Sequence, residues 1–379
     1  MSPLSLPAGI AGAALVGVIL WDAFETILVP RRIGRRVRLT RYFYVAAWRA
    51  WRALALRTNP PARRESLLGF FGPLSLILLL TLWAAGLIVA FALLEFAAGG
   101  AAGSDSLGFA TLLYMSGETF FTLGFGDFTP ATPLGRVFAV AEAGLGFGFL
   151  GTVVGYLPTL YAAFAQREIE ISLMDARAGS PPTAAEFLRR TPPAEAGGLC
   201  DDVLSAWERW AAQLLETHIS YPQLAYYRSQ HSNQSWLGSL VTILDSTSLL
   251  LARDGAAPNS QARLTYAMAR HALVDITQVF VHRPPAAFAE RLPPATAARL
   301  REALAATPLA LPPSSGFESR LAELRLKYEP YAQALASHLM IELPPWIHDT
   351  ARRDNWQGGP WDRQLAPHRE PAHRTDEHF

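Results

Sequence analysis

The sequence contains very little cysteine and lysine. Cys200 is the only cysteine in 379 residues, which excludes a framework of disulfides within the chain. Lys327 is the only lysine, so almost every basic side chain is an arginine. The formal net charge is +1, and a chain without a broad positive field is not expected to bind nucleic acid.

Charge is missing from two long segments. Residues 66–94 contain no charged side chain, and residues 137–166 contain only Glu142. Each segment is longer than the ~20 apolar residues that a helix needs to cross the core of a bilayer. The alternative is a buried helix of a large soluble protein, a class in which two such segments close together are rare. We therefore expect membrane helices at about residues 67–95 and 134–165.

A third apolar segment, residues 8–21, is shorter. Its length would also suit the core of a signal peptide. No basic residue precedes it, however, and Arg31 and Arg32 follow it. This is the charge pattern of an uncleaved membrane anchor whose amino end lies outside, so we expect a further membrane helix that ends before Pro30.

Acidic residues are missing from residues 31–64, which contain eleven arginines. An excess of basic residues marks the cytoplasmic side of a membrane. The three helices are therefore expected to run inward, outward and inward. The chain would be a multi-pass protein of the cell membrane, with its amino terminus outside and everything after Arg167 in the cytoplasm.

Aromatic residues and arginines alternate at helical spacing in residues 40–56. This pattern predicts an amphipathic helix that lies on the inner membrane surface, with lipid as its partner. A voltage sensor is the alternative, because Arg49 and Arg52 are three residues apart. A sensor would need a longer series of arginines in a membrane-length helix, and partner helices that this chain lacks.

The loop between the second and third expected membrane helices has an unusual composition. Ser104, Asp105 and Ser106 offer caps for a helix, and residues 107–121 predict a helix too short to span the membrane. TLGFGD follows at 122–127. Backbone that is not helical survives at membrane depth only where it is buried in protein or lines a watery cavity. This segment therefore either lines a pore or lies outside the bilayer.

Backbone carbonyls explain why a pore lining needs glycine. Rings of carbonyl oxygens can replace the water shell of a cation such as potassium, and successive carbonyls point at one axis only if the backbone alternates in hand. Residues with positive φ should be glycine, and Gly124 and Gly126 flank Phe125 as this geometry requires. Thr122 adds a hydroxyl oxygen, and the preceding helix points the negative end of its dipole toward the same place.

The segment TLGFGD resembles the TVGYG signature of the potassium-channel pore family. GETFFTLGFGD at 117–127 is similar to the bacterial members of that family, including the glutamate four residues before the threonine. The resemblance covers about residues 68–165. It implies passive conduction of K+ through a selectivity filter made of Thr122, Leu123, Gly124, Phe125 and Gly126.

The motif occurs once in the chain. A ring of four carbonyls at each level then requires four chains, so the resemblance implies a homotetramer. It also implies a protein that is not an enzyme and holds no cofactor, with K+ as the transported ion. Leu123, Phe125 and Phe121 replace the usual valine, tyrosine and threonine. The rigidity of the filter and the degree of selectivity therefore stay open.

Glu118 and Asp127 are the acidic residues on either side of the filter. In the potassium channels whose motif they resemble, the matching carboxyl groups meet behind the filter and one of them shares a proton. Two carboxylates that close do not both ionise cheaply, so the pair would brace the filter. The alternative is that Asp127 faces water at the outer mouth while Glu118 contacts backbone.

Glycines and one proline interrupt the third membrane helix. The spacing in relatives places a gating hinge on Gly146, whereas the alternative is close helix packing through small residues. Pro158 should kink the helix near its cytoplasmic end. Carboxylates within a membrane face protein or water. We expect Glu142 to pack behind the filter rather than face the ion cavity, and Asp22 and Glu25 to pair with arginines at the inner interface.

The second half of the chain predicts more helices, separated by pairs of prolines. No glycine-rich nucleotide motif follows a strand, and no strand pattern suggests a cyclic-nucleotide module. An unknown ligand, either an anion or a metal, is one interpretation of the polar residues here; ordinary core and surface positions are the other. The candidate residues are His218, Arg228, His231, Arg270, His271, Asp275 and His282.

The fold class that follows is an all-α membrane protein in which three membrane helices, a re-entrant pore helix and a filter precede a helical cytoplasmic domain that influences gating. The expected parts are an amino-terminal membrane helix (1–30), a basic loop with an interfacial helix (31–66), a pore domain (67–166), a helical domain (167–356) and a flexible tail (357–379). A membrane-anchored enzyme or ligand sensor with a vestigial pore loop is the second functional hypothesis.

Overall fold

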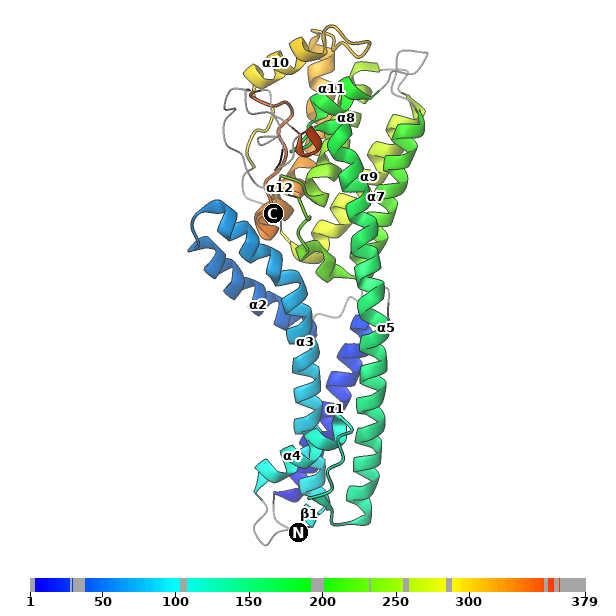
Figure 1. Cartoon of the computed structure of the whole chain (residues 1–379). Coiled ribbons are helices and arrows are strands. Elements are labelled where there is room, and N and C mark those ends of the chain that lie inside the picture. Colours follow the sequence, from blue (N-terminus) through cyan, green and yellow to red (C-terminus); the bar gives the residue numbers. More distant parts are fainter. Residues whose placement is uncertain are drawn as a thin grey trace. The chain divides into compact units, whose positions relative to one another are not determined.

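The computed structural model describes residues 4–27, 29, 38–102, 108–191, 201–231, 233–254, 259–283, 288–350, 354–357 and 361. The expected caps at 104–106, Cys200, residues 30–37 and nearly all of the expected tail lie outside the described residues. The chain divides into two compact units, Met1–Ala162 and Ala163–Phe379, and the elements of both are labelled in Figure 1. The fold is almost entirely α-helical, as expected.

The helices of the first unit follow the expected order. They are α1 (Ser5–Ile27), α2 (Leu39–Leu56), α3 (Pro61–Ala98) and α4 (Phe109–Phe120), followed by α5 (Pro133–Ala178), which continues into the second unit. The three longest apolar helices, α1, α3 and α5, are each long and apolar enough to cross a membrane. The expected membrane helices, the interfacial helix and the short pore helix are therefore all present as helices.

Two expected boundaries are wrong. α3 begins at Pro61 rather than near residue 67, because a proline at the first helical position has no amide hydrogen to leave unpaired and already has a helical φ. Two arginines of the expected loop, Arg63 and Arg64, thus belong to its first turn. α5 continues without a break past residue 165 to Ala178. The third membrane helix and the first helical segment of the second unit are one element.

Small residues let α1 and α3 pack closely and antiparallel (Figure 1). A Cβ on Gly12 would lie 2.7 Å from the carbonyl oxygen of Ala90, and a Cβ on Gly86 would lie 2.5 Å from Ile19 Cδ1. Helices in lipid gain their stability from such close backbone packing. The buried side chains between these helices, together with the last residue of α4, form one core cluster of Ile19, Leu79, Trp83, Ala84, Leu87 and Phe120.

The acidic residues of α1 differ in their partners. Glu25 pairs with Arg38 at 3.4 Å, as expected. Asp22 does not follow the expectation, since its partners among the described residues are Thr40 and Trp83 rather than an arginine. Its carboxylate accepts hydrogen bonds from the backbone N–H (3.1 Å) and hydroxyl (2.6 Å) of Thr40, and from Trp83 Nε1 (3.0 Å). Asp22 therefore caps the amino end of α2, whose own N-cap residue contributes no side-chain bond.

α2 packs one face on α3 and leaves the other exposed. Trp48 lies 4.8 Å from the ring of Phe71 between centroids, and Trp51 Nε1 donates to the carbonyl of Leu67 at 3.0 Å. The exposed face carries apolar side chains, among them Tyr42 and Val45, between the arginines. Such a face suits the headgroup region of a bilayer.

The second unit is a helical assembly. It contains the end of α5, α6 (Ala184–Arg190), α7 (Asp201–Ser220), η1 (Pro222–Tyr226), α8 (Trp236–Asp254), α9 (Ser260–Phe280), α10 (Pro294–Leu304), α11 (Ser315–Leu326), α12 (Glu329–Leu339) and η2 (Asn355–Gln357). The expected proline breaks that lie among the described residues separate these helices, at 181–182, 293–294 and 312–313.

Buried charges hold the centre of the second unit. Arg291 forms ion pairs with Asp245 (2.7 Å) and Glu329 (3.2 Å). Tyr328 donates its hydroxyl to the same aspartate at 2.5 Å. The negative charges on either side raise the pKa of Arg291 and keep it ionised despite its burial. This network ties α8 to α12 and to the segment before α10.

Candidate functional site

The pore helix α4 passes directly into the TLGFGD segment. Its last turn closes with Phe121 N donating to Gly117 O (3.0 Å) and Thr122 N donating to Thr119 O (3.1 Å). Leu123 N then donates to Glu118 O at 2.7 Å. These bonds use the carbonyls that a helix end otherwise leaves unpaired. They fix where the first residues of the segment leave the helix.

The backbone alternates in hand along the segment. Thr122, Gly124 and Gly126 have φ values of 57°, 63° and 78°, whereas Leu123 and Phe125 between them do not have positive φ. The two glycines were expected at such positions. Thr122 was not, because positive φ in a β-branched residue is a genuine outlier. Strain of this kind persists only where the surroundings impose it, and it is common at functional sites.

The same segment is exposed in the single chain. Residues 121–127 are all exposed, including the large apolar side chains of Leu123 and Phe125. At its outer end, β2 (Thr129–Pro130) pairs antiparallel with β1 (Ala101–Ala102). Thr132 Oγ1 donates to Ala98 O at 2.9 Å and accepts from Gly135 N at 3.1 Å. The segment is thus anchored at both ends, while its middle has no cover within the chain.

The carboxyl groups of Glu118 and Asp127 meet beside this segment. Glu118 is hydrogen-bonded to the side chain of Asp127 and accepts from the backbone N–H of Phe125. Asp127 also accepts from Phe128 N at 3.2 Å. Glu118 therefore contacts both the backbone, as in one interpretation, and the second carboxyl, as in the other.

Tyr114 is a member of this group that the sequence reasoning missed. Its hydroxyl is hydrogen-bonded to the side chain of Asp127, and its ring packs edge-on against Phe128 with centroids 6.0 Å apart. Phe125 lacks the hydroxyl that braces the filter in many members of the resembled family. A tyrosine hydroxyl from the pore helix contacts the outer end of the segment instead. The four-residue spacing between Tyr114 and Glu118 could have indicated this contact, because it places Tyr114 one helical turn before Glu118 on the same face of α4.

Gly146 marks a close contact between α5 and α4. A Cβ on Gly146 would overlap the carbonyl oxygen of Phe120 and lie 2.8 Å from its carbonyl carbon. One turn along α5, the ring of Phe149 lies 5.8 Å from that of Phe120. This observation fits the interpretation of close packing through small residues. A hinge at Gly146 stays a prediction, as does one at Pro158, through which the helix continues unbroken.

Glu142 is buried against the pore helix, as expected. Only 1% of it is exposed, and its Oε1 lies 2.5 Å from the hydroxyl of Ser116 on α4. It lies one helical turn before Gly146 on the same face of α5. Because it is already covered within one chain, it does not face an ion cavity.

The polar candidates of the second unit have separate partners. His218 is buried, packs against Trp236 with tilted rings whose centroids lie 4.8 Å apart, and has Nε2 3.4 Å from Arg167 Nη1. Arg228 donates from Nη2 to the carbonyls of Leu339 and Met340. The remaining described candidates are His231, Arg270, His271, Asp275 and His282.

These remaining candidates do not form a metal site. His271 and Asp275 lie 3.8 Å apart on the exposed side of α9, and Arg270 donates to the carbonyl of Lys327 at 3.0 Å. No group of three or more His, Cys, Asp or Glu side chains that could hold a metal occurs among the described residues. For these residues, ordinary core and surface positions fit the contacts best. A ligand of this unit stays a prediction.

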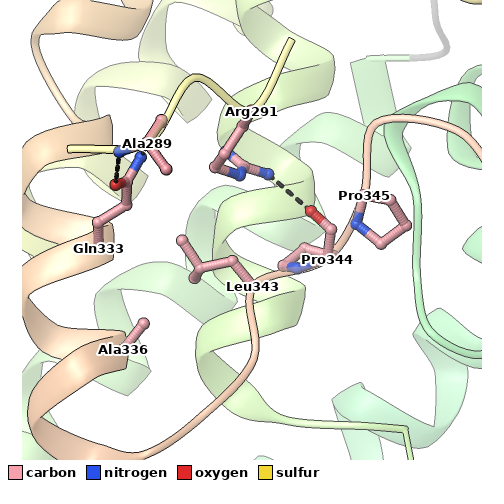
Figure 2. Close-up of a pocket in the computed structure, with 7 residues that line it drawn as sticks. All are labelled: Ala289, Arg291, Gln333, Ala336, Leu343, Pro344 and Pro345. Carbon is pink, nitrogen blue, oxygen red and sulfur yellow. Dashed lines mark hydrogen bonds between the residues drawn. The ribbon is translucent and has the colours of Figure 1, made fainter. Parts of the chain in front are cut away.

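Figure 2 shows residues that line an open pocket of the second unit. The volume of this pocket is about 430 Å³. Its polar wall groups already have partners. Gln333 exchanges two hydrogen bonds of 2.7 Å with the backbone of Ala289, and Arg291 Nη2 donates to Pro344 O at 2.8 Å. None of the seven polar candidates belongs to the described wall, which consists of Ala289, Arg291, Gln333, Ala336, Leu343, Pro344 and Pro345.

A comparison with known families matches the first unit. Residues 76–162 match the model of a family described as "Ion channel". This part of the chain resembles ion channels. The matched segment contains most of α3, all of α4, the TLGFGD segment and α5 as far as Ala162. No curated protein and no solved structure matches the chain. The match and the three apolar helices together support an ion channel embedded in a membrane.

Proposed function

We propose that the protein is a potassium-selective channel that conducts K+ passively through the segment TLGFGD. The alternation of hand at Thr122, Gly124 and Gly126 carries the proposal. Such alternation turns successive carbonyl oxygens toward one side of the segment. Carbonyl rings that replace a hydration shell need this arrangement.

The conducting unit is a homotetramer. One chain contributes one filter segment, so a closed ring of carbonyls needs further copies. Leu123 and Phe125 are exposed in the single chain, and α5 buries few of its apolar side chains there. Neighbouring copies would cover both. Closed rings of identical subunits are the usual solution for such one-sided surfaces.

The channel crosses the cell membrane three times, with the amino terminus outside and the second unit in the cytoplasm. An odd number of crossings places the two ends of the chain on opposite sides. The arginines of residues 31–64 favour the cytoplasm for the α1–α3 connection. The amphipathic α2 then lies on the inner surface, in contact with lipid.

The second unit biases the gate. α5 continues from the pore unit into this unit as one helix, and Ile171 and Met174 near its end are buried there. A continuous helix transmits a change of packing at one end more directly than a loop does. The protein is a channel and not an enzyme in this proposal.

The test is ion flux from liposomes that contain the purified protein. We expect a K+ gradient to drive flux well above that of Na+, and cross-linking to trap four chains. A chain that ends after Arg167 should keep its selectivity and change its open probability. Equal K+ and Na+ flux, or none, would contradict the proposal. Tight binding of a soluble ligand by a protein that passes no ions would favour the anchored sensor instead.

A further inference from the structure

The hydroxyl of Ser116 on the pore helix faces two oxygen atoms. Ser116 Oγ lies 2.8 Å from the carbonyl oxygen of Ile88 on α3 and 2.5 Å from Glu142 Oε1 on α5. A serine hydroxyl has a single hydrogen to donate, and a carbonyl oxygen can only accept. If Glu142 were a carboxylate, its oxygen and Ile88 O would have to share this one hydrogen, and at least one of the two contacts would be weaker than a full hydrogen bond.

We propose that Glu142 is a positioning residue that acts as a neutral carboxylic acid. Its O–H donates to Ser116 Oγ, whose own hydrogen goes to Ile88 O. Both short distances are then hydrogen bonds. The chain of two bonds joins α5 to α4 and α4 to α3, in a place where Ser116 and Glu142 are almost completely buried.

Among the described residues, no other group is hydrogen-bonded to Glu142 as a donor for the second bond. Glu95, on α3, is the ionisable group that faces Glu142 from a neighbouring helix. Glu95 is fully buried, and both of its carboxyl oxygens have no hydrogen-bond partner among the described residues. A second acid cannot act as a counter-cation. Buried polar groups without a partner are costly, so a proton on Glu142 is the arrangement that satisfies Ser116.

The two hydrogen bonds of Ser116 hold the pore helix in place where the filter begins. Ser116 and Phe120 are one turn apart on α4, and Glu142 and Gly146 are one turn apart on α5. Ser116 is hydrogen-bonded to Glu142, and Phe120 is in close backbone contact with Gly146. α5 therefore contacts the pore helix at two successive levels just before Thr122. This role in conduction rests on the proposed function, whereas the proton on Glu142 does not.

Infrared spectroscopy of the full-length protein in liposomes tests the proton directly. We expect the wild type to show the carbonyl stretch of a protonated carboxylic acid at neutral pH, and the Glu142→Gln variant to lose that band. A band that persists unchanged in Glu142→Gln would overturn the assignment, because Glu95 or Glu118 would then be its source. This measurement needs no ion flux, so it decides the matter even if the protein proves not to conduct.

Conduction and stability test the role of the bond. An amide N–H replaces the acid O–H in Glu142→Gln, so we expect near wild-type K+ flux and melting temperature. Glu142→Ala removes the hydrogen bond to Ser116, and Ser116→Ala removes this bond and the one to Ile88 O. Loss of a buried hydrogen bond corresponds to about tenfold in an equilibrium, and we expect K+ over Na+ selectivity to fall by about that factor.

The matched control is Ser75→Ala. Ser75 is equally buried, but its hydroxyl donates to Gly72 O of its own helix at 2.9 Å, so we expect little change of selectivity. If Glu142→Gln loses as much as Glu142→Ala, an ionised carboxylate is required and the proposal is wrong. If Ser116→Ala retains both selectivity and melting temperature, the bond does not position the pore helix.

Discussion

α3 and α5 are similar in composition and differ in how much of their surface the chain covers. In the most apolar 18 residues of each helix, 44% are buried for α3 and 11% for α5. α3 packs against α1, α2 and α4. α5 exposes large side chains such as Val140 (75%) and Phe147 (73%). Hydrophobicity alone therefore does not show which helix completes its contacts within one chain, and the uncovered helix needs lipid, a water-filled cavity or further copies.

The coverage of α5 also changes along its length. Before Ala162 its contacts with the pore helix lie on one face, at Glu142, Gly146 and Phe149, and Tyr156 and Leu160 further along are also buried. Beyond that point, Arg167 and Ile171 are almost completely buried within the second unit. The helix thus has one face against the pore helix, an exposed face beside it, and an end packed in the second unit. Substitutions can separate these three environments.

The largest effect is expected at the covered face of α5. Gly146→Ala places a methyl group on the carbonyl oxygen of Phe120, and overpacking of this kind costs about 1–3 kcal/mol per chain. We expect a much lower yield of folded protein and a lower melting temperature in detergent. Gly148→Ala is the matched control, because its Cβ meets nothing within 4 Å. Equal stability of the two variants would show that the helices separate without cost.

The TLGFGD segment should respond differently, because the described residues leave it exposed. A Cβ on Gly124 meets no atom within 4 Å, yet φ is 63° there. Alanine in the left-handed region costs about 1–2 kcal/mol per residue, repeated in every copy around a ring. We expect Gly124→Ala to fold and to lose K+ selectivity, measured as a shift of the reversal potential. Gly144→Ala, also without a close neighbour, should keep it. A wild-type reversal potential in Gly124→Ala would refute the filter assignment.

Two exposed side chains test what covers the exposed face of α5. Phe147 on α5 and Ile77 on α3 are both large, apolar and exposed in the single chain. If α5 faces neighbouring copies or the pore, Phe147→Ala should change tetramer stability or conductance by several-fold, whereas Ile77→Ala on a lipid-facing surface should change neither. Native mass spectrometry and single-channel recording measure the two properties. Equal responses would mean that lipid covers both helices.

The smallest effect concerns the buried end of α5. Arg167 Nη1 donates to His218 Nε2, so the hydrogen of the imidazole lies on Nδ1 and goes to Leu214 O at 2.9 Å. Burial, and then the charge of Arg167, hold the pKa of His218 well below its usual value. The unfolded chain therefore binds a proton below pH ~6.5 that the folded chain does not.

Stability should accordingly fall as the pH drops below this value, by at most about 1.4 kcal/mol per pH unit from this residue. The melting temperature of the second unit, followed in the full-length protein between pH 7.5 and 5.5, measures the effect. His218→Gln should lower stability at neutral pH and weaken the dependence on pH. An unchanged pH dependence in this variant would place its origin in another group.

The long apolar segments predicted the helices well. A single segment that crosses a membrane must satisfy its backbone hydrogen bonds internally, and an α-helix does so. The glycines at 124 and 126 were predicted from the geometry of carbonyl rings, and their positive φ values agree. The bonds of Ser116, Tyr114 and Asp22 could not be predicted in this way. Each joins residues from different elements, and spacing along one helix contains no information about the partner on another.

Two features depend on contacts that the sequence does not show. Thr122 adopts positive φ although its side chain disfavours it, in a backbone that is held by hydrogen bonds from Thr122 N and Leu123 N to the end of α4. Gly146 had two interpretations, a hinge from the spacing in relatives and close helix packing, and its contact with Phe120 depends on how both helices are placed.

Through Asp22, α1 stabilises other helices of the first unit, a role that its position at the start of the sequence does not suggest. The interfacial helix α2 depends on this carboxylate, supplied by another helix, for hydrogen bonds at its amino end. Trp83 of α3 contacts the same carboxylate. A shortened chain that began at α2 would keep every filter residue and lose this support. Such a chain is not a minimal version of the protein, because the amino end of α2 and Trp83 would lose the acceptor of their hydrogen bonds.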